Sequence, residues 1–508
     1  MNIRKVEDLK NIEFGQLLEK LLYISNQKKI TLAKELGYDI SYISKWINGR
    51  NLPTQKSILN ICKVTSQFIV KSLNPISKQE LKRYFEIELQ VKDDTELVRF
   101  IDRILNESYI FTAQKNSSNL YKSTHSEDNY NSMLHINPRL RKKYLSKDLD
   151  LYVNESSKLD IILSTNLYKL KSIDKIYIAG MKSSLAEIQK NNEVRVRFLT
   201  GFEGIENDIV LNTFIIIYMI TTYNDLNFEI YNCDVDNSNI LSVIKDRMFH
   251  SAIFSSNGRC LLTNMTKERT IVDEAYYSFE EIIKDQGNLL VEKKCPIQMI
   301  KDKIYIQYIM GQDFRWILGS INEFFMPSDL FMELAQSLFG EDEEVLQELY
   351  QINIFLQNIT YKSDIKMLIY ESELIKYIST CEVMFFNIPI KLTFEQMERH
   401  IKNIEDIITK YKNVEIKFIE GSILDNNYFE INPSIYLSKN IKLMKTSNIN
   451  NSNDYAVVKD MEFKNVCDKL FEKCWNIKCQ KIVSDKNEIL DVISKTLIYA
   501  KIISEKMQ

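Results

Sequence analysis

Residues 31–54 read TLAKELGYDISYISKWINGRNLPT, and this stretch decides the fold of the N-terminal part of the chain. Apolar residues recur at helical spacing on both sides of Gly37, which predicts two short helices joined by a tight turn. Gly37 can adopt the positive φ that such turns often require, and Asp39 can cap the second helix with its side-chain oxygen. The second helix would bury Ile43 and Trp46. We therefore expect a rigid helix pair with one polar, partly basic face left exposed.

The pattern of this helix pair resembles the XRE family of Cro/CI-like repressors, over roughly residues 11–72. In that family the helix that would run here from Asp39 to Ile47 enters the major groove of DNA. The resemblance implies four base-facing side chains, at Ile40, Ser41, Ser44 and Lys45. It implies six phosphate-facing side chains, at Lys29, Tyr42, Asn48, Arg50, Lys56 and Ser57.

Two positions depart from the family pattern. The family often has Gln where this chain has Lys29, and Arg or Gln where it has Ile40. Lys29 still suits a phosphate. Ile40 cannot hydrogen-bond a base edge and can at most pack against a thymine methyl group. Direct readout of the bases would then depend mainly on Lys45.

The same apolar pattern occurs in small helical bundles that contact only other proteins. The capped turn, the S-x-W-x-x-G-R closure and Pro53, which would open the next helix over residues 54–65, favour DNA binding. Charge agrees, because residues 1–90 contain 15 Lys and Arg against 9 Asp and Glu. Subtracting these from the totals of 66 and 69 leaves 51 against 60 in the remainder. Residues 1–90, the head, are thus basic, and the rest of the chain, the body, is acidic. A basic head can attract the phosphates of DNA to that end of the protein.

Length and composition indicate a multidomain globular protein. A chain of 508 residues is too long for one hydrophobic core, and its 45% hydrophobic and 27% charged residues are ordinary values. The most apolar run, residues 213–223, is far shorter than the roughly 20 residues of a membrane-spanning helix. The first residues lack the apolar stretch of a secretory signal. We expect a cytoplasmic protein without membrane contact, with residues 213–223 in a buried core.

Metal and cofactor sites are not indicated by the eight cysteines and four histidines. The closest cysteines, Cys467, Cys474 and Cys479, are separated by six and four residues and have no histidine nearby. Structural zinc sites usually show more closely paired ligands. The chain also lacks a phosphate-binding loop and a dinucleotide glycine fingerprint. We expect no metal, no cofactor and no catalytic residue.

The sequence predicts an all-α N-terminal helix-turn-helix bundle followed by an α/β body. The expected parts are a helix-turn-helix domain (1–75), a helical extension (76–112), a linker (113–145), an α/β unit (146–299), a helical connector (300–364) and a second α/β unit (365–508). The runs VRVRFLTG at 194–201 and VEIKFIEG at 414–421 are similar, so the two α/β units could be related. Two unrelated α/β domains are the alternative.

His250 is the candidate for a catalytic role in the body. It precedes a hairpin around Asn257-Gly258, and a duplicated α/β body of this kind loosely resembles the phospholipase D superfamily. That superfamily carries H-x-K-x4-D, with His as nucleophile and Lys on the phosphate. Here Ala252 and Asn257 stand at the Lys and Asp positions, and the second unit has no equivalent histidine. We therefore expect no enzymatic activity, and a structural or ligand-pocket role for His250.

These features predict a sequence-specific, DNA-binding transcriptional regulator of bacterial or phage origin. One head reads few base pairs, so we expect a homodimer on double-stranded DNA with a pseudo-palindromic operator. The body would supply the dimer contact or a pocket for a small-molecule or peptide effector. Six aromatic residues are candidates for lining such a pocket, with an ordinary hydrophobic core as the alternative. They are Tyr305, Tyr308, Phe314, Trp316, Phe324 and Phe325. The alternatives are a DNA- or protein-binding component of a phage-defence or toxin–antitoxin system and, less favoured, a phospholipase D-like phosphodiesterase.

Overall fold

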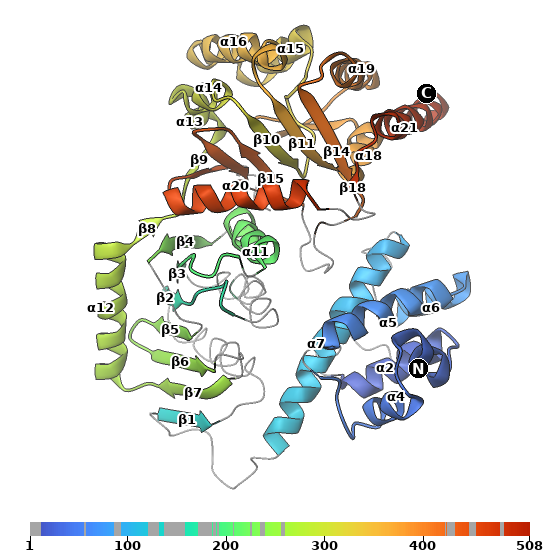
Figure 1. Cartoon of the computed structure of the whole chain (residues 1–508), viewed down its shortest axis with the longest axis vertical. Coiled ribbons are helices and arrows are strands. Elements are labelled where there is room, and N and C mark those ends of the chain that lie inside the picture. Colours follow the sequence, from blue (N-terminus) through green and yellow to red (C-terminus); the bar gives the residue numbers. More distant parts are fainter. Residues whose placement is uncertain are drawn as a thin grey trace. The chain divides into compact units, whose positions relative to one another are not determined.

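The chain forms two compact units in the computed structural model (Figure 1). Unit 1 comprises Met1–Ser156, Ser255–Asn264 and Asn426–Tyr428, and unit 2 comprises Ser157–Phe254, Met265–Asp425 and Phe429–Gln508. The structure describes residues 12–54, 57–85, 93–119, 132–136, 158–170, 185, 189, 193–206, 208–223, 226–233, 239–255, 260–421, 423, 432–446, 454–477 and 482–507.

Unit 1 is a helical bundle. Its helices are α2 (Phe14–Ile24), α3 (Lys29–Leu36), α4 (Ile40–Ile47), α5 (Ile58–Ser72), α6 (Pro75–Tyr84) and α7 (Asp94–Asn119). The strand β1 (Ser132–Ile136) and most of β7 (Cys260–Thr266) also fall in this unit. Completely buried apolar side chains from five helices form the core, among them Leu21, Leu32, Ile43, Ile69 and Leu105. The helical bundle expected at the N-terminus is therefore present.

Two boundaries in unit 1 differ from the sequence pattern. Helix α5 begins at Ile58 rather than at residue 54, and the Ser57 amide just before it donates to the Thr54 carbonyl at 3.0 Å. Helix α7 runs to Asn119, into the stretch assigned above to a linker. That end of α7 lacks apolar residues at helical spacing, so the pattern carried no sign of a helix.

The first module of unit 2, residues 158–254 and 265–289, is built on a mixed sheet. Its strands are β2 (Lys158–Ser164), β3 (Glu193–Thr200), β4 (Asn227–Asn232), β5 (Ile240–Ile244), β6 (Met248–Phe254) and β8 (Asn288–Leu289), in the spatial order β6-β5-β2-β3-β4-β8. Strands β2, β3 and β4 are parallel, and β5 and β6 continue antiparallel beside β2. The helices are α11 (Ile209–Thr222) and α12 (Arg269–Gln286). Helix α11 is buried on nearly all sides, as expected for the apolar run.

The second module, residues 291–507, contains an eight-stranded sheet in the order β18-β14-β11-β10-β15-β16-β17-β9. These strands are β9 (Val291–Lys294), β10 (Phe314–Leu318), β11 (Ile365–Tyr370), β14 (Val414–Ile419), β15 (Ser434–Leu437), β16 (Lys442–Lys445), β17 (Tyr455–Val458) and β18 (Ile482–Val483). A separate hairpin pairs β12 (Glu382–Phe385) with β13 (Ile388–Lys391). The helices are α13 (Pro296–Lys301), α14 (Ile304–Ile309), α15 (Ser328–Phe339), α16 (Glu343–Gln357), α17 (Ile359–Lys362), α18 (Glu371–Thr380), α19 (Phe394–Lys410), α20 (Met461–Trp475) and α21 (Lys486–Met507).

The two modules share one strand order. In each, three parallel strands lie in chain order, and an antiparallel run continues beside the first of them. The similar runs do not occupy equivalent places, however. VRVRFLTG lies on β3, the middle parallel strand, and VEIKFIEG lies on β14, the third. The common strand order therefore supports a relation between the modules better than those two runs do.

Strand β10 lies within residues 300–364, the stretch interpreted above as a helical connector. It is an inner strand of the second sheet, paired with β11 on one side and β15 on the other. Only five residues form it, between Asp313, which has φ +61°, and Gly319. A strand this short inside a helical region hardly alters the average pattern.

Leu290 is the single residue of the chain that links the two modules, and it hydrogen-bonds to both. Its amide donates to the Ile230 carbonyl of β4 at 2.9 Å, and its carbonyl accepts from the Lys459 amide at 2.8 Å. Helix α20 lies between the two sheets and packs against α11 (Figure 1). There the Phe202 and Phe463 rings stack with centroids 5.6 Å apart. Both modules consequently belong to one packed body.

Among the described residues, no helix combines the length and apolarity needed to cross a lipid bilayer.

Candidate nucleic-acid interface

The turn between α3 and α4 has the predicted capping. Gly37 ends α3 with φ 70° and ψ 28°, in the left-handed region that a residue without Cβ adopts easily. The Asp39 carboxylate then accepts a hydrogen bond from the Ser41 amide at 2.8 Å and caps α4. Hydrogen bonding from Ser41, reinforced by the positive charge of Lys45, lowers the pKa of Asp39. The cap therefore stays ionised at neutral pH.

Helix α4 buries one face and exposes the other. Ile43, Trp46 and Ile47 are buried in the bundle. All four base-facing side chains predicted above reach solvent: Ile40, Ser41 and Lys45 are exposed and Ser44 is half-buried. Tyr42 is 48% exposed, and the Lys45 ammonium lies 5.5 Å from the centroid of its ring. The outer face of α4 thus combines an apolar side chain, two hydroxyls and a cation.

The predicted phosphate-facing residues lie around this helix. Lys29, in the first turn of α3, has a partly exposed side chain 3.7 Å from the Glu19 carboxylate. Asn48 and Arg50 are exposed directly after α4. The Ser57 hydroxyl is half-buried and donates to the Thr54 carbonyl at 3.1 Å. Lys56 falls outside the described residues.

A close helix crossing sets the position of α4. Gly15 of α2 lies against the last turn of α4, where a Cβ atom would be only 2.5 Å from the carbonyl oxygens of Trp46 and Ile47. A side chain at residue 15 would therefore push the two helices apart. The sequence pattern did not single out Gly15, although a glycine inside an apolar helical pattern often marks such an approach.

The loop after α4 is held at both ends. Gly49 has φ 67°, and the amides of Arg50 and Asn51 both donate to the Lys45 carbonyl, at 3.0 and 3.3 Å. At the far end, the Tyr109 hydroxyl of α7 donates to the Pro53 carbonyl at 3.0 Å, within the buried interior. Tyr109 is 56 residues away in sequence, so no local pattern could reveal this contact.

Unit 1 also contains a buried carboxyl group. Asp102 of α7 is 9% exposed, and its Oδ1 accepts from the Asn106 side chain at 3.3 Å. Burial raises the pKa of Asp102 to about 6, although the positive charge of Lys63 acts in the opposite direction. The protonation of this group consequently changes within an experimentally convenient pH range.

His250, the candidate nucleophile, is only 2% exposed and lies on β6 opposite Ser242 of β5. Ala252, on the same strand, pairs with Ile240, and Asn257 falls outside the described residues. Within the described part of the chain, no group of three or more His, Cys, Asp or Glu side chains is arranged to hold a metal ion. The geometry therefore offers His250 little contact with a solvent-borne substrate.

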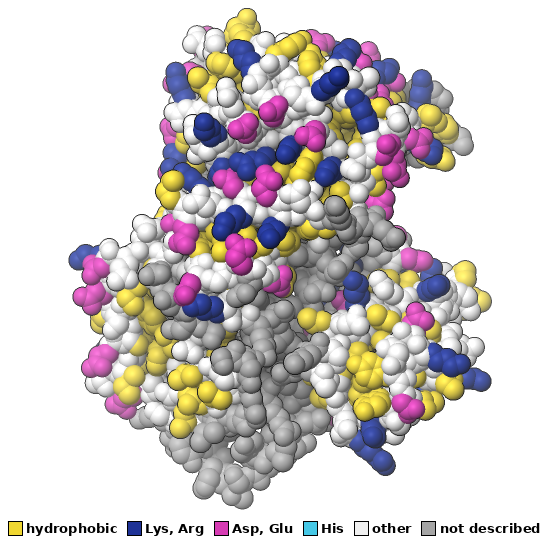
Figure 2. Space-filling view, in the orientation of Figure 1, with side chains coloured by type: hydrophobic (Ala, Val, Ile, Leu, Met, Phe, Trp, Pro, Cys, Tyr) yellow, Lys and Arg dark blue, Asp and Glu magenta, His cyan; other side chains and the backbone are white. Residues whose placement is uncertain are grey.

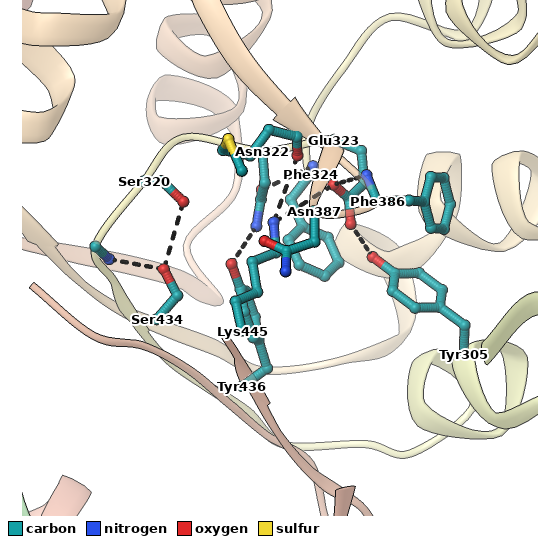
Figure 3. A network of polar contacts seen from close by, with 12 residues as sticks. Tyr305, Ser320, Asn322, Glu323, Phe324, Phe386, Asn387, Ser434, Tyr436 and Lys445 are labelled. Atoms are coloured by element: carbon teal, nitrogen blue, oxygen red, sulfur yellow. Dashed lines mark hydrogen bonds and ion pairs between the residues drawn. The ribbon is translucent and has the colours of Figure 1, made fainter. Parts of the chain in front are cut away.

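The aromatic residues considered above as a pocket are all in the core of the second module. Each is less than 10% exposed, and the Trp316 and Phe324 rings stack with centroids 4.2 Å apart. Beside them lies the buried carboxylate of Glu323 (Figure 3), which accepts from the Tyr305 hydroxyl and from the Phe386 amide, the latter at 3.1 Å. The Lys445 ammonium, 3.9 Å away, completes a buried ion pair. Burial lowers the pKa of Lys445.

An open groove of about 460 Å³ lies between the segment after β3 and helix α20. Its lining includes Phe202, Ile205, Glu462, Asn465, Asp468 and Lys469. Lys and Arg side chains lie beside Asp and Glu side chains across the visible face of the second module (Figure 2). This face therefore does not have the single sign of charge that favours nucleic-acid phosphates.

Comparisons with known proteins agree with the geometry of unit 1. Residues 26–65 match a family model described as helix-turn-helix. No curated protein matches the chain. The crystal structure of polyphosphate kinase from Porphyromonas gingivalis is 11% identical with a TM-score of 0.21, over 74% of this chain and 56% of that chain. The present chain thus spans little more than half of that protein. The resemblance to the phospholipase D superfamily stated from the sequence has no support in these comparisons. The match over residues 26–65 agrees with the helix-turn-helix, similar to that of the XRE family, that their sequence predicts.

Proposed function

We propose that the protein is a sequence-specific transcriptional regulator whose helix α4 enters the major groove of DNA. One observation carries this proposal. Helix α4 is capped by Asp39, anchored by Ile43 and Trp46, and exposes Ile40, Ser41 and Lys45 on one side. A rigid helix with an exposed mixed face is what direct reading of base edges requires.

The four predicted base-facing positions of α4 have different capacities for base contact. Lys45 is the one cation among them and can donate to guanine O6 and N7. Ser41 and Ser44 supply weaker hydroxyl contacts, and Ile40, 42% exposed, can pack against a thymine methyl group. Specificity would then depend on Lys45, on thymine contacts and on DNA shape.

The phosphate contacts are assigned to Lys29, Tyr42, Asn48, Arg50, Lys56 and Ser57. The pairing of Lys29 with Glu19 is long and solvent-exposed, so that it costs little to exchange for a phosphate. Asn48 and Arg50 flank Gly49 and are exposed at the end of α4. Ser57 would have to release its bond to Thr54 in order to donate to a phosphate.

The body is assigned a regulatory role without catalysis. We place dimer formation there, since a dimer of helix-turn-helix heads matches a pseudo-palindromic operator. A small-molecule or peptide effector would bind in the groove beside α20, which lies after the carboxyl end of β3. Ligands of α/β sheets commonly bind at this edge, and the groove also contacts both modules. The buried position of His250 agrees with a body that binds rather than reacts.

Selection of binding sites from random double-stranded DNA tests the proposal with the full chain. A short inverted repeat should be enriched, and its absence would refute sequence-specific binding. Lys45→Ala should relax the preference at one or two positions at a cost of roughly 1–3 kcal/mol. Arg50→Ala should weaken binding to all sequences alike and reduce the salt slope by about 1. Lys71→Ala, which removes an exposed cation from α5, is the matched control and should leave base preference unchanged.

A further inference from the structure

Helix α7 contacts the start of α2 and the loop after α4 through three buried polar side chains. The Ser108 hydroxyl donates to the Ile12 carbonyl at 2.6 Å, and the Thr112 hydroxyl accepts from the Phe14 amide at 2.5 Å. These two bonds hold the start of α2. Tyr109 points to the loop after α4, where its hydroxyl donates to the Pro53 carbonyl at 3.0 Å. One turn of α7 thus fixes two segments that are about 40 residues apart in sequence.

From this arrangement we infer that Tyr109 is a positioning residue for phosphate contact by the loop after α4. The inference rests on the DNA-binding function proposed above. The loop begins at the Lys45 carbonyl, which accepts from the Arg50 and Asn51 amides, and ends at Pro53, which Tyr109 holds. Asn48 and Arg50 flank the positive-φ residue Gly49 at its start. With both ends fixed, these two side chains are pre-organised toward the DNA backbone.

The hydroxyl of Tyr109 can be removed without removing its ring. The ring packs edge-to-face against Phe14 with centroids 5.8 Å apart, and the side chain is 4% exposed. Phenylalanine retains this packing but leaves the buried Pro53 carbonyl without its donor, which is costly for a buried acceptor. Burial also raises the pKa of Tyr109 to about 12, so that the hydroxyl remains a donor at every pH used for DNA binding.

Tyr109→Phe in the full chain separates positioning from simple stabilisation. We expect affinity to fall about five- to tenfold for every DNA sequence, since a net hydrogen bond of this kind is worth about 1 kcal/mol. The salt slope should become shallower and base preference should stay unchanged, because phosphate contacts alone are disturbed. Amide exchange should accelerate at Arg50 and Asn51. Replacement of Tyr109 by 4-aminophenylalanine, whose amine also donates, should restore both affinity and salt slope.

Ser108→Ala is the matched control. It removes a buried hydrogen bond from the neighbouring residue, but at the start of α2, so unit 1 should lose stability while the salt slope stays that of the wild type. If Tyr109→Phe lowers stability without changing affinity or salt slope, or if it alters base preference, the positioning role is wrong. If Tyr109→Phe does not fold, the positioning role is also wrong, because the hydroxyl is then required for folding itself. Failure of the wild-type chain to select any DNA sequence would overturn the proposed function and this inference together.

Discussion

Replacing Gly15 by alanine should disturb the DNA-reading helix without touching any of its residues. The added Cβ would lie 2.5 Å from the carbonyl oxygens of both Trp46 and Ile47. An ordinary contact between these atoms begins near 3.4 Å, so α2 and α4 would have to separate by about 0.9 Å. Both obstructing atoms are backbone, and no side-chain rotation can relieve the overlap.

The energetic cost follows from two opposing effects. Overpacking of a tight interior contact costs about 1–3 kcal/mol, and here two carbonyls resist the same methyl group. Alanine regains up to about 1 kcal/mol over glycine in helix propensity. Because two backbone carbonyls resist the methyl group, the upper end of the first range, about 3 kcal/mol, applies, and subtracting about 1 kcal/mol leaves an expected net destabilisation of about 2 kcal/mol. The displacement of α4 should in addition weaken DNA binding, because base contacts tolerate little change in helix position.

Amide hydrogen exchange in the full chain measures this effect locally. The free energy of opening of α2 and α4 should fall by about 2 kcal/mol, whereas the helices of unit 2 should be unaffected. Gly49→Ala is the control, because a Cβ there meets no atom within 4 Å and only the φ of 67° opposes it. That variant should lose about 1 kcal/mol. If the free energies of opening of α2 and α4 in Gly15→Ala equal those of the wild type, the close crossing of the two helices does not constrain α4.

Three further predictions concern buried ionisable groups. The pKa of Asp102 rises from 3.8 to about 6, so the contribution of its protonated carboxyl group to the stability of unit 1 should be fully present below about pH 4 and should fall by about 3 kcal/mol as the pH rises through 6; Asp102→Asn should abolish this component of the pH dependence in chemical denaturation. His400 is buried with its pKa lowered from 6.5 to about 4, so unit 2 should lose about 3 kcal/mol as the pH falls from 6.5 to 4. His400→Gln, which can keep the contacts to Tyr377 and the Phe324 carbonyl, should remove that dependence in the same assay. Lys445→Met should cost about 3–5 kcal/mol by leaving Glu323 without its cation, and most of this should be regained when Glu323→Gln is added.

The sequence predicts the local features of the DNA-binding unit well. Gly37, Asp39 and Trp46 act within ten residues of one another, so that spacing alone identifies the turn, the cap and the buried face. Gly15 and Tyr109 depend on contacts with residues more than 30 positions away. Such contacts leave no periodic signal in a single sequence, and only the folded structure reveals them.

The body was predicted more coarsely. Alternating strands and helices indicate its α/β class, and the apolar run around residue 215 is buried as expected. Strand β10 was overlooked because five residues inside a helical region barely change its average pattern. The similarity of VRVRFLTG and VEIKFIEG suggested that their strands correspond, but β3 is the middle one of three parallel strands whereas β14 is the third. The composition of a segment indicates whether the segment is buried. The order of strands in a sheet depends instead on hydrogen bonding between segments far apart in the sequence, which composition does not indicate.

The joint at Leu290 has a consequence for how the chain folds during synthesis. Strand β9 follows it directly, but its neighbour in the second sheet is β17, with Val291 opposite Val458. At 5–20 residues per second, translation separates these two strands by roughly 10–30 s. Throughout that interval β9 is an unpaired edge tethered to a nearly complete first module. Its sequence, VEKK, contains three charged side chains in succession. Charged side chains on an exposed edge disfavour pairing with strands of other chains until β17 has been synthesised.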